Sequence, residues 1–307
     1  MKVLIFGSSG MVGSSLAKKL DLSNNFSSVV PSSRKDTNLF SFEETLSKIE
    51  KESPDFIVNC AAMVGGIVAN NELRTEFIIN NLKINLNILE SIRKYKNIKM
   101  INLGSSCIYP LGAEIPIKED ALMTGKLEPT NSPYAMAKLS AIEIGDSMTK
   151  QYGHKILNLM PTNLYGQNDN FDLNNSHVIP GLISRMYQSK LKNESSFNVW
   201  GTGKPLREFL HVDDLSNAIE FLIINNIDSG IYNVGSGEEI SIFDLANKIK
   251  EVIDFKGEIV FDTNFPDGNP RKLLDSSKLN SLGWTPSIKL DEGLKQTYKW
   301  FLENKTT

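Results

Sequence analysis

The chain has 307 residues, of which 40% are hydrophobic, and its 33 basic and 36 acidic side chains give a formal net charge of −3. A chain of this length buries a substantial core in one large domain or two smaller ones. The charges are spread without long blocks of one sign, which argues against a nucleic-acid partner or an anionic membrane surface. A small-molecule partner is therefore expected.

Two cysteines, Cys60 and Cys107, occur in unrelated contexts without the spacing of a disulfide framework or a zinc site. We therefore expect no metal and a reducing, cytoplasmic location. The apolar run near the N-terminus, Val3–Phe6, is too short for a signal peptide or a membrane span. Neither export nor insertion into a membrane is expected.

The first half of the chain alternates short β-type runs with helix-length segments, which is typical of a doubly wound parallel sheet. The predicted strands are Val3–Phe6, Val29–Pro31, Phe56–Asn59, Met100–Leu103 and Leu157–Met160. The predicted helices are Met11–Leu20, Phe42–Lys51, Glu72–Lys94 and Tyr134–Gln151. These elements predict an α/β fold in which a Rossmann-type doubly wound parallel sheet carries a smaller C-terminal α/β substrate domain.

The pattern becomes irregular after Pro161, which suggests loops that cross into a second region. We assign residues 1–168 to a nucleotide-binding domain and residues 169–307 mainly to a substrate-binding domain. Two later runs, Phe209–Asp213 and Ile231–Val234, are expected to return to the first sheet, so about residues 205–236 also belong to the first domain. Ser241–Ile253 predicts a helix with a capping box from Ser241 to Asp244.

A glycine-rich motif follows the first predicted strand and opens the first predicted helix. It consists of Gly7, Ser8, Ser9, Gly10, Met11, Val12 and Gly13. Glycines let backbone N–H groups approach a pyrophosphate, and the helix N-terminus adds partial positive charge. The motif therefore predicts a dinucleotide site rather than an ordinary turn.

The end of the second predicted strand indicates which dinucleotide is bound. An acidic side chain there would accept hydrogen bonds from a ribose 2′-hydroxyl, whereas the sequence continues Ser32-Ser33 into Arg34 and Lys35. The guanidinium of Arg34 suits a 2′-phosphate, which favours NADP(H) over NAD(H). The alternative is that Arg34 is a solvated surface charge.

A tyrosine and a lysine stand four residues apart at Tyr134 and Lys138, which places them on one face of a helix. A tyrosine has an unperturbed pKa of about 10, and a nearby cation favours the phenolate and lowers that pKa. Ser105 follows the strand Met100–Leu103, at the edge where open α/β sheets bind ligands. Together these residues predict a ketone reductase.

Two further groups are candidates for proton transfer. Cys107 lies two residues after Ser105 and is expected on the same side, where a thiol can exchange a proton with a carbon beside a ketone. The alternative is a buried structural cysteine. His177 precedes an expected helix, where it serves either chemistry or a capping or surface role.

Eight further segments occur in order along the chain: residues 61–70, 103–110, 127–134, 160–166, 176–180, 200–203, 207–214 and 266–275. In these segments, and on to Asn304, the chain resembles the GDP-L-fucose synthase family of extended short-chain dehydrogenases/reductases. The resemblance implies that a GDP-linked keto-deoxy sugar, GDP-4-keto-6-deoxy-D-mannose, is epimerised at carbons 3 and 5 and reduced at the 4-keto group by NADPH.

The resemblance also assigns roles. Cys107 and His177 become the epimerisation acid/base pair, Ser105 and Tyr134 stabilise the enolate oxygen, and Tyr134 protonates the alkoxide. Further cofactor contacts are implied at Leu103, Gly104, Ser105, Ser106, Lys138, Pro161, Thr162, Asn163, Leu164 and His177. Substrate contacts are implied at Arg185, Trp200, Arg207 and Asp267.

One departure concerns Ser9, where many bacterial members carry a basic residue, so the preference for NADPH rests mainly on Arg34. The resemblance implies a homodimer that packs through the helices Glu72–Lys94 and Tyr134–Gln151.

A dehydratase is disfavoured because Ser106 and Cys107, rather than carboxylates, follow Ser105. Two alternatives stay open: a sister synthase of another GDP-linked sugar such as GDP-L-colitose, and a dinucleotide-sensing protein without catalysis.

Overall fold

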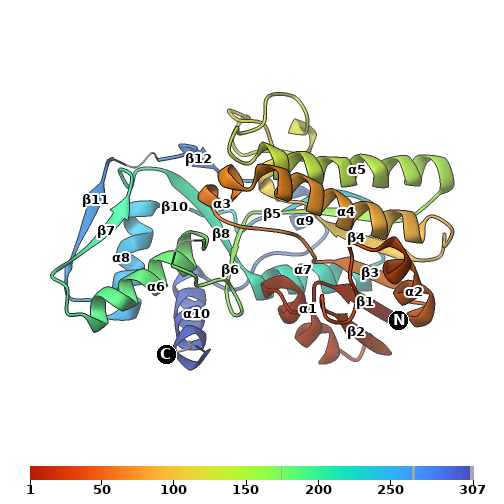
Figure 1. The fold of residues 1–307 in the computed structure, drawn as a ribbon, viewed down its shortest axis with the longest axis horizontal. Helices are drawn as coiled ribbons and strands as arrows, with labels where there is room; N and C mark the ends of the chain where they lie inside the picture. Colours follow the sequence, from red (N-terminus) through yellow and green to blue (C-terminus); the bar gives the residue numbers. More distant parts are fainter. Residues whose placement is uncertain (174, 265–266, 305–307) are drawn as a thin grey trace.

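The structure, a computed structural model, describes residues 1–173, 175–264 and 267–304, apart from the side chains of residues 67 and 68. Pro266, in one of the family-resembling segments, lies outside the described residues. Figure 1 shows a large lobe that contains the N-terminus and a smaller lobe that contains the C-terminal helix.

A six-stranded parallel sheet forms the centre of the large lobe, with strand order β2-β1-β3-β4-β5-β9. The strands are β1 (Lys2–Phe6), β2 (Ser28–Ser32), β3 (Phe56–Asn59), β4 (Lys99–Leu103), β5 (Ile156–Pro161) and β9 (Gly230–Val234). The central strands are nearly continuous apolar runs because helices cover both faces of the sheet. The Rossmann-type prediction is confirmed.

Helices pack on the two faces of this sheet. On one face α1 (Met11–Asp21) and α7 (Val212–Ile224) contact each other and bury Val3 and Ile5. On the other face α2 (Phe42–Glu52), α4 (Arg74–Ile92) and α5 (Ser132–Tyr152) bury Leu4 and Phe6. The alternation along β1 thus separates two cores. Helices α4 and α5 lie side by side along the outer edge of the large lobe (Figure 1).

The smaller lobe contains two short sheets and three long helices. One sheet joins β6 (Asn163–Tyr165), β8 (Leu206–His211), β10 (Glu239–Ser241) and β12 (Arg271–Lys272), and the other pairs β7 (Ser196–Trp200) with β11 (Glu258–Asp262). The helices are α6 (Val178–Leu191), α8 (Ile242–Ile253) and α10 (Leu290–Asn304), which share one apolar cluster. The remaining short helices are α3 (Ile67–Glu72), η1 (Ser106–Ile108), η2 (Glu119–Ala121) and α9 (Ser277–Asn280).

Two predicted elements differ from the structure. The helix expected from residue 72 is broken at Leu73, whose ψ of 42° is not helical, so α3 ends before α4 begins. Phe209–Asp213 does not return to the central sheet, because β8 pairs with β6, β10 and β12, and α7 begins at Val212. By contrast, Ile231–Val234 does return, as part of β9.

The predicted cap of α8 is confirmed, since the Ser241 hydroxyl accepts a hydrogen bond from the Asp244 amide at 3.0 Å. Among the described residues, no helix has both the length and the apolar character needed to cross a bilayer.

Candidate active site

The glycine-rich turn between β1 and α1 is shaped by close backbone packing. Gly7 has a φ of +76°, and a Cβ there would lie 2.6 Å from the Ala61 nitrogen. A Cβ at Gly13 would lie 2.2 Å from the Gly7 oxygen, so both positions require glycine. At Gly10 a Cβ would meet only the Gly7 oxygen, at 3.5 Å, which leaves this point open to a ligand.

The N-terminus of α1 follows at once and has no side-chain cap and no acidic residue in its first turn. Its N–H groups are therefore free of competing side-chain acceptors, and the helix dipole favours an anion there. These features of the turn and the helix fit the pyrophosphate of a dinucleotide.

At the end of β2, small polar side chains bond to one another. Ser32 and Thr37 share a hydrogen bond of 2.9 Å, and the Asp36 carboxylate accepts bonds from the Ser33 amide and hydroxyl at 2.8 and 2.7 Å. The Ser33 bonds lower the pKa of Asp36. Arg34 is exposed and, within the described part of the chain, forms no hydrogen bond or ion pair, so its guanidinium is available to a ligand.

Ser105, Tyr134 and Lys138 come together at the C-terminal end of β4. The Ser105 hydroxyl lies next to the Tyr134 phenol and acts to lower the pKa of that phenol. Lys138 Nζ lies 5.8 Å from the centre of the Tyr134 ring and donates to the Leu103 carbonyl oxygen at 2.7 Å. Helix α5 therefore presents the tyrosine and the lysine to the strand end that carries the serine, as the spacing predicts.

The expected lowering of the Tyr134 pKa is wrong for this structure. Protein atoms crowd the phenol, and burial raises its pKa above the ordinary value, with a smaller contribution from Cys107. Lys138 is only 2% exposed, and burial lowers the pKa of its ammonium to about 8. Desolvation outweighs the lowering effect of the Ser105 hydroxyl, so the raised pKa favours the protonated phenol, which can donate a hydrogen bond.

Cys107 lies in η1, immediately after β4, and is half-buried. Its amide donates to the Ser105 hydroxyl at 3.1 Å, which fixes the backbone of Cys107 beside the serine. Lys272 Nζ approaches Cys107 Sγ to 3.6 Å, and Arg207 also interacts electrostatically with the thiol. The thiol therefore belongs to the site rather than to the apolar core.

His177 is the N-cap residue of α6, but its imidazole makes no capping hydrogen bond. Surrounding protein atoms lower the pKa of the imidazole, although the residue keeps considerable exposed surface. The preceding residue, Ser176, packs against the large lobe, because a Cβ at Gly66 would lie 3.0 Å from the Ser176 oxygen. This packing fixes the segment that carries His177 against the loop after β3.

The remaining predicted cofactor contacts lie at two neighbouring strand ends. Leu103, Gly104 and Ser106 are buried around the end of β4, and a Cβ at Gly104 would lie 2.3 Å from Met160 Sδ. Beyond β5 the chain continues through Pro161, Thr162, Asn163 and Leu164. The Thr162 and Asn163 side chains donate to the Glu208 carbonyl oxygen, at 3.3 and 2.8 Å, and thereby join β5 to β8.

Three of the predicted substrate contacts form a half-buried cationic and aromatic surface in the small lobe. The Arg185 guanidinium lies 4.8 Å from the centre of the Trp200 ring. Burial lowers the pKa of both Arg185 and Arg207, which shows that their charges are partly desolvated. Such cations suit a diphosphate, and an exposed tryptophan beside an arginine suits a planar base or a sugar face.

Asp267 braces this surface. Its carboxylate accepts bonds from the Thr202 amide and hydroxyl at 2.6 and 2.8 Å, and these bonds lower its pKa. Gly201, with a φ of +84°, brings the backbone close to the same carboxylate. Both carboxylate oxygens are engaged with the turn after Trp200.

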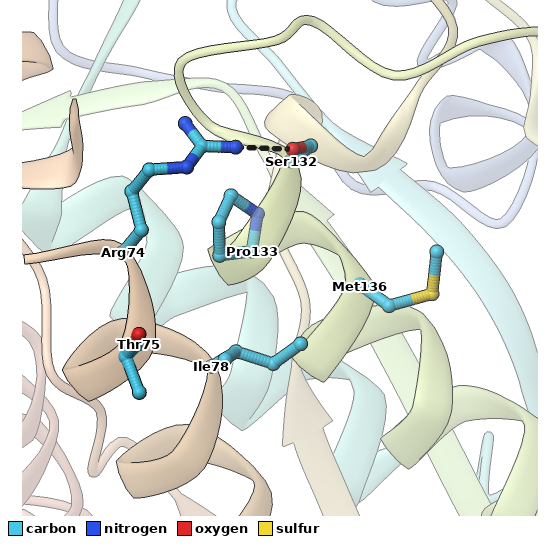
Figure 2. Close-up of a pocket in the computed structure, with 6 residues that line it drawn as sticks. All are labelled: Arg74, Thr75, Ile78, Ser132, Pro133 and Met136. Carbon is cyan, nitrogen blue, oxygen red and sulfur yellow. Dashed lines mark hydrogen bonds between the residues drawn. The ribbon is translucent and has the colours of Figure 1, made fainter.

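A surface cavity of about 340 Å³ adjoins the segment before Tyr134. Figure 2 shows it between the starts of α4 and α5, with Arg74 pointing to Ser132. Arg74 donates to the Pro129 oxygen at 2.9 Å and to the Ser132 hydroxyl at 3.2 Å, which ties the loop before Tyr134 to α4.

Sequence reasoning missed two residues at the site. Glu128 accepts four hydrogen bonds from Thr130 and Asn131, which together lower its pKa and fix the start of α5. Lys272 approaches the Cys107 thiol only because β12 pairs with β8. The position of Lys272 within the family-resembling segment 266–275 was the only feature of the sequence that could have indicated it.

Comparison with known proteins identifies the family to which the site belongs. Residues 3–235 match the model of the NAD dependent epimerase/dehydratase family. The chain is 45% identical over 303 residues to GDP-L-fucose synthase 1 of Arabidopsis thaliana, covering 99% of this chain and 94% of that protein. It is 42% identical over 313 residues to GDP-L-fucose synthase of Escherichia coli, covering 99% and 97%.

A more distant relative and a solved structure complete the comparison. GDP-L-colitose synthase of Yersinia pseudotuberculosis is 33% identical over 308 residues, covering 99% of both chains. A solved GDP-L-fucose synthetase from Naegleria fowleri bound to NADP superposes with a TM-score of 0.90 at 29% identity, covering 99% of this chain and 93% of that one.

Proposed function

Because the chain belongs to the GDP-L-fucose synthase family, we propose that it epimerises GDP-4-keto-6-deoxy-D-mannose at carbons 3 and 5 and reduces the 4-keto group to give GDP-L-fucose. The observation that carries this proposal is the placement of Cys107 beside the Ser105–Tyr134 pair. A plain reductase needs the pair but has no use for a thiol at this point.

Epimerisation begins when a proton leaves a carbon beside the 4-keto group and its electron pair shifts to the keto oxygen. Ser105 and Tyr134 donate hydrogen bonds to this oxygen, and the raised pKa of Tyr134 keeps its donor proton in place. Cys107 and His177 exchange the carbon-bound protons. Both epimerisations proceed next to the same carbonyl, so one pair of donors serves both.

Reduction uses the same oxygen. When bound, the dinucleotide would supply a hydride to carbon 4. Tyr134 gives its phenolic proton to the oxygen that becomes the alcohol. Lys138, held by the Leu103 carbonyl, places a cation beside the resulting phenolate. Its charge stabilises the tyrosine after the proton has left.

The dinucleotide is proposed to be NADP(H), because Arg34 presents an exposed cation at the end of β2. Gly7, Gly10 and Gly13 accommodate its pyrophosphate. The similarity to the NADP-bound Naegleria fowleri structure supports this choice.

GDP-L-colitose synthase provides the second candidate function, as the 33% identity to the Yersinia pseudotuberculosis enzyme spans the whole chain. That candidate uses the same proton-transfer residues and differs in the sugar.

We also propose that the two lobes bind different ligands and that the protein forms a homodimer. The central sheet and its helices, which include α7 and β9 from the segment 205–236, are proposed to bind the cofactor, whereas residues 169–307 otherwise mainly bind the substrate, with β8 and Arg207 on the substrate side. A homodimer through α4 and α5 is supported by exposed apolar side chains on these helices: Ile79 and Leu86, seven residues apart on α4, and Met136 on α5. The free cysteines Cys60 and Cys107 support a cytoplasmic location.

The decisive experiment incubates the protein with GDP-4-keto-6-deoxy-D-mannose and NADPH and identifies the product sugar. Oxidation of NADPH with formation of GDP-L-fucose is expected. No NADPH oxidation would refute a synthase, whereas turnover only of the 3-deoxy analogue would favour the colitose enzyme.

A further inference from the structure

The Cys107 thiol is surrounded by cations that come from the other lobe. Lys272 on β12 donates to Sγ at 3.6 Å, and Arg207 on β8 interacts with the same sulfur electrostatically. Strand β12 pairs in parallel with β8, and the register sets Lys272 opposite Arg207. Both cations therefore extend from adjacent strands toward the end of β4.

Lys272 is not explained by a structural ion pair. Over the described ranges, no carboxylate lies within ion-pair distance of its ammonium, and the thiol is its hydrogen-bond acceptor. The preceding residue, Arg271, forms a two-point pair with Glu239 on β10, at 2.6 to 3.1 Å. Adjacent residues of a strand point to opposite sides, so Arg271 stabilises the sheet while Lys272 faces the site.

The ammonium of Lys272 lies 3.6 Å from the Cys107 sulfur, and its attraction for negative charge is stronger where water is partly excluded. The titratable or charged groups that face Cys107 are the Tyr134 phenol from α5, Arg207 from β8 and Lys272 from β12. Two of the three are cations, and the third remains a neutral phenol because burial raises its pKa.

We propose that Lys272 is a catalytic group of the epimerisation half-reaction, where its ammonium holds Cys107 Sγ as the thiolate that removes substrate protons. This role rests on the proposed function. In the step, the sulfur lone pair forms the S–H bond, the carbon–hydrogen bond breaks, and its electron pair forms the enolate with the 4-keto oxygen. Solvent then takes the proton from the thiol, which restores the ion pair with Lys272.

The test compares Lys272→Met, Lys272→Arg and the neighbouring control Arg271→Gln. Alkylation of Cys107 by iodoacetamide, followed by mass spectrometry of its peptide, reports the thiolate without any substrate. We expect alkylation at pH 7 to slow about tenfold in Lys272→Met, to recover in part in Lys272→Arg, and to stay near wild type in Arg271→Gln. The alkylation profile of Lys272→Met should move to higher pH.

The second readout is exchange of substrate protons with deuterated water. The kcat for exchange should fall about tenfold or more in Lys272→Met. Unchanged alkylation with a raised KM would overturn the proposal, since Lys272 would then be a diphosphate contact only. If the wild type exchanges no substrate protons, the proposed function fails instead, and the alkylation rates still decide whether Lys272 acts on the thiol.

Discussion

The two lobes hold their cations in different ways. In the large lobe, Lys138 is almost fully buried, donates to the Leu103 carbonyl oxygen and lies beside the Tyr134 ring. In the small lobe, three cations are half-buried. Arg185 lies over the Trp200 ring, Arg207 donates to the Leu206 carbonyl oxygen, and Lys272 donates to the Cys107 thiol. Over the described ranges, these three cations form no ion pair, and the ion pairs of the small lobe are formed by other residues, such as Lys248 with Asp291 and Arg271 with Glu239.

This difference separates chemistry from binding. Lys138 is fixed by the Leu103 carbonyl at the end of one strand of the central sheet, and it can therefore hold the neighbouring Tyr134 in position for proton transfer. The half-buried guanidiniums of Arg185 and Arg207, which among the described residues lack a neutralising carboxylate at ion-pair distance, suit an anion such as a diphosphate. Variants of the proposed proton-transfer residues in the large lobe should therefore alter turnover, and variants of Arg185 and Arg207 in the small lobe should alter substrate affinity.

The largest expected effect is that of Tyr134→Phe, which removes the proton donor of the large lobe. Hydride transfer should fall by roughly 10²- to 10⁴-fold, whereas exchange of substrate protons should fall less because Ser105 still donates to the oxygen. Single-turnover oxidation of NADPH and deuterium incorporation measure the two steps separately. The opposite pattern is expected for Cys107→Ser, and equal loss of both steps in both variants would refute the division.

An intermediate effect is expected in the small lobe for Arg207→Met. Loss of charge-assisted hydrogen bonds to a diphosphate should raise the substrate KM about 10- to 100-fold and leave kcat much less affected. Lys289→Met is the matched control, because its exposed partner Glu238 lies in a surface ion pair. A large fall in kcat with an unchanged KM would contradict the assignment of this lobe to binding.

A smaller effect is expected at the cofactor end of the large lobe. Arg34→Asp replaces an exposed cation with a group that repels a 2′-phosphate, so the ratio of kcat/KM for NADPH over NADH should fall about tenfold or more. Lys35→Asp serves as the matched variant one residue away. If the ratio is unchanged in Arg34→Asp, Arg34 does not determine the cofactor preference. A changed ratio in Lys35→Asp alone would assign the preference to Lys35.

The sequence predicted the parts of the molecule that depend on local pattern. The strands of the central sheet are apolar runs, the glycine turn lies at a strand–helix junction, and Tyr134 and Lys138 are one helical turn apart. Each of these features is defined by neighbours within a few residues. The sheet of the small lobe was not predicted, because β6, β10 and β12 have only two or three residues each and pair with β8 from distant parts of the chain.

Contacts between distant parts of the chain also explain why Lys272 was missed and why the direction of the Tyr134 pKa shift was wrong. Lys272 reaches Cys107 only through the pairing of β12 with β8, a contact that no local pattern encodes. The pKa of Tyr134 depends on how many protein atoms surround the phenol, so the spacing to Lys138 indicated the partner but gave the wrong direction of the shift.

Lys138→Met should stabilise the fold while it removes catalysis. Burial lowers the pKa of Lys138 from 10.5 to about 8, so the unfolded chain binds this proton more tightly than the folded chain. The cost is therefore complete below pH 8, and it disappears as the pH rises from 8 through 10.5. After the lost bond to Leu103 is subtracted, the variant should gain on the order of 1–2 kcal/mol in free energy of unfolding at pH 7.

Thermal unfolding measured at pH 7 and again above pH 10 checks this prediction. The Tm of Lys138→Met should exceed that of the wild type at pH 7, and the difference should shrink at the higher pH. A lower Tm for the variant at pH 7 would mean that the Leu103 bond outweighs the desolvation of the ammonium. Lys138 would then stabilise the fold in addition to its proposed catalytic role. The large-lobe and small-lobe cations would then differ in where they lie, but burial of Lys138 would no longer carry a cost in stability.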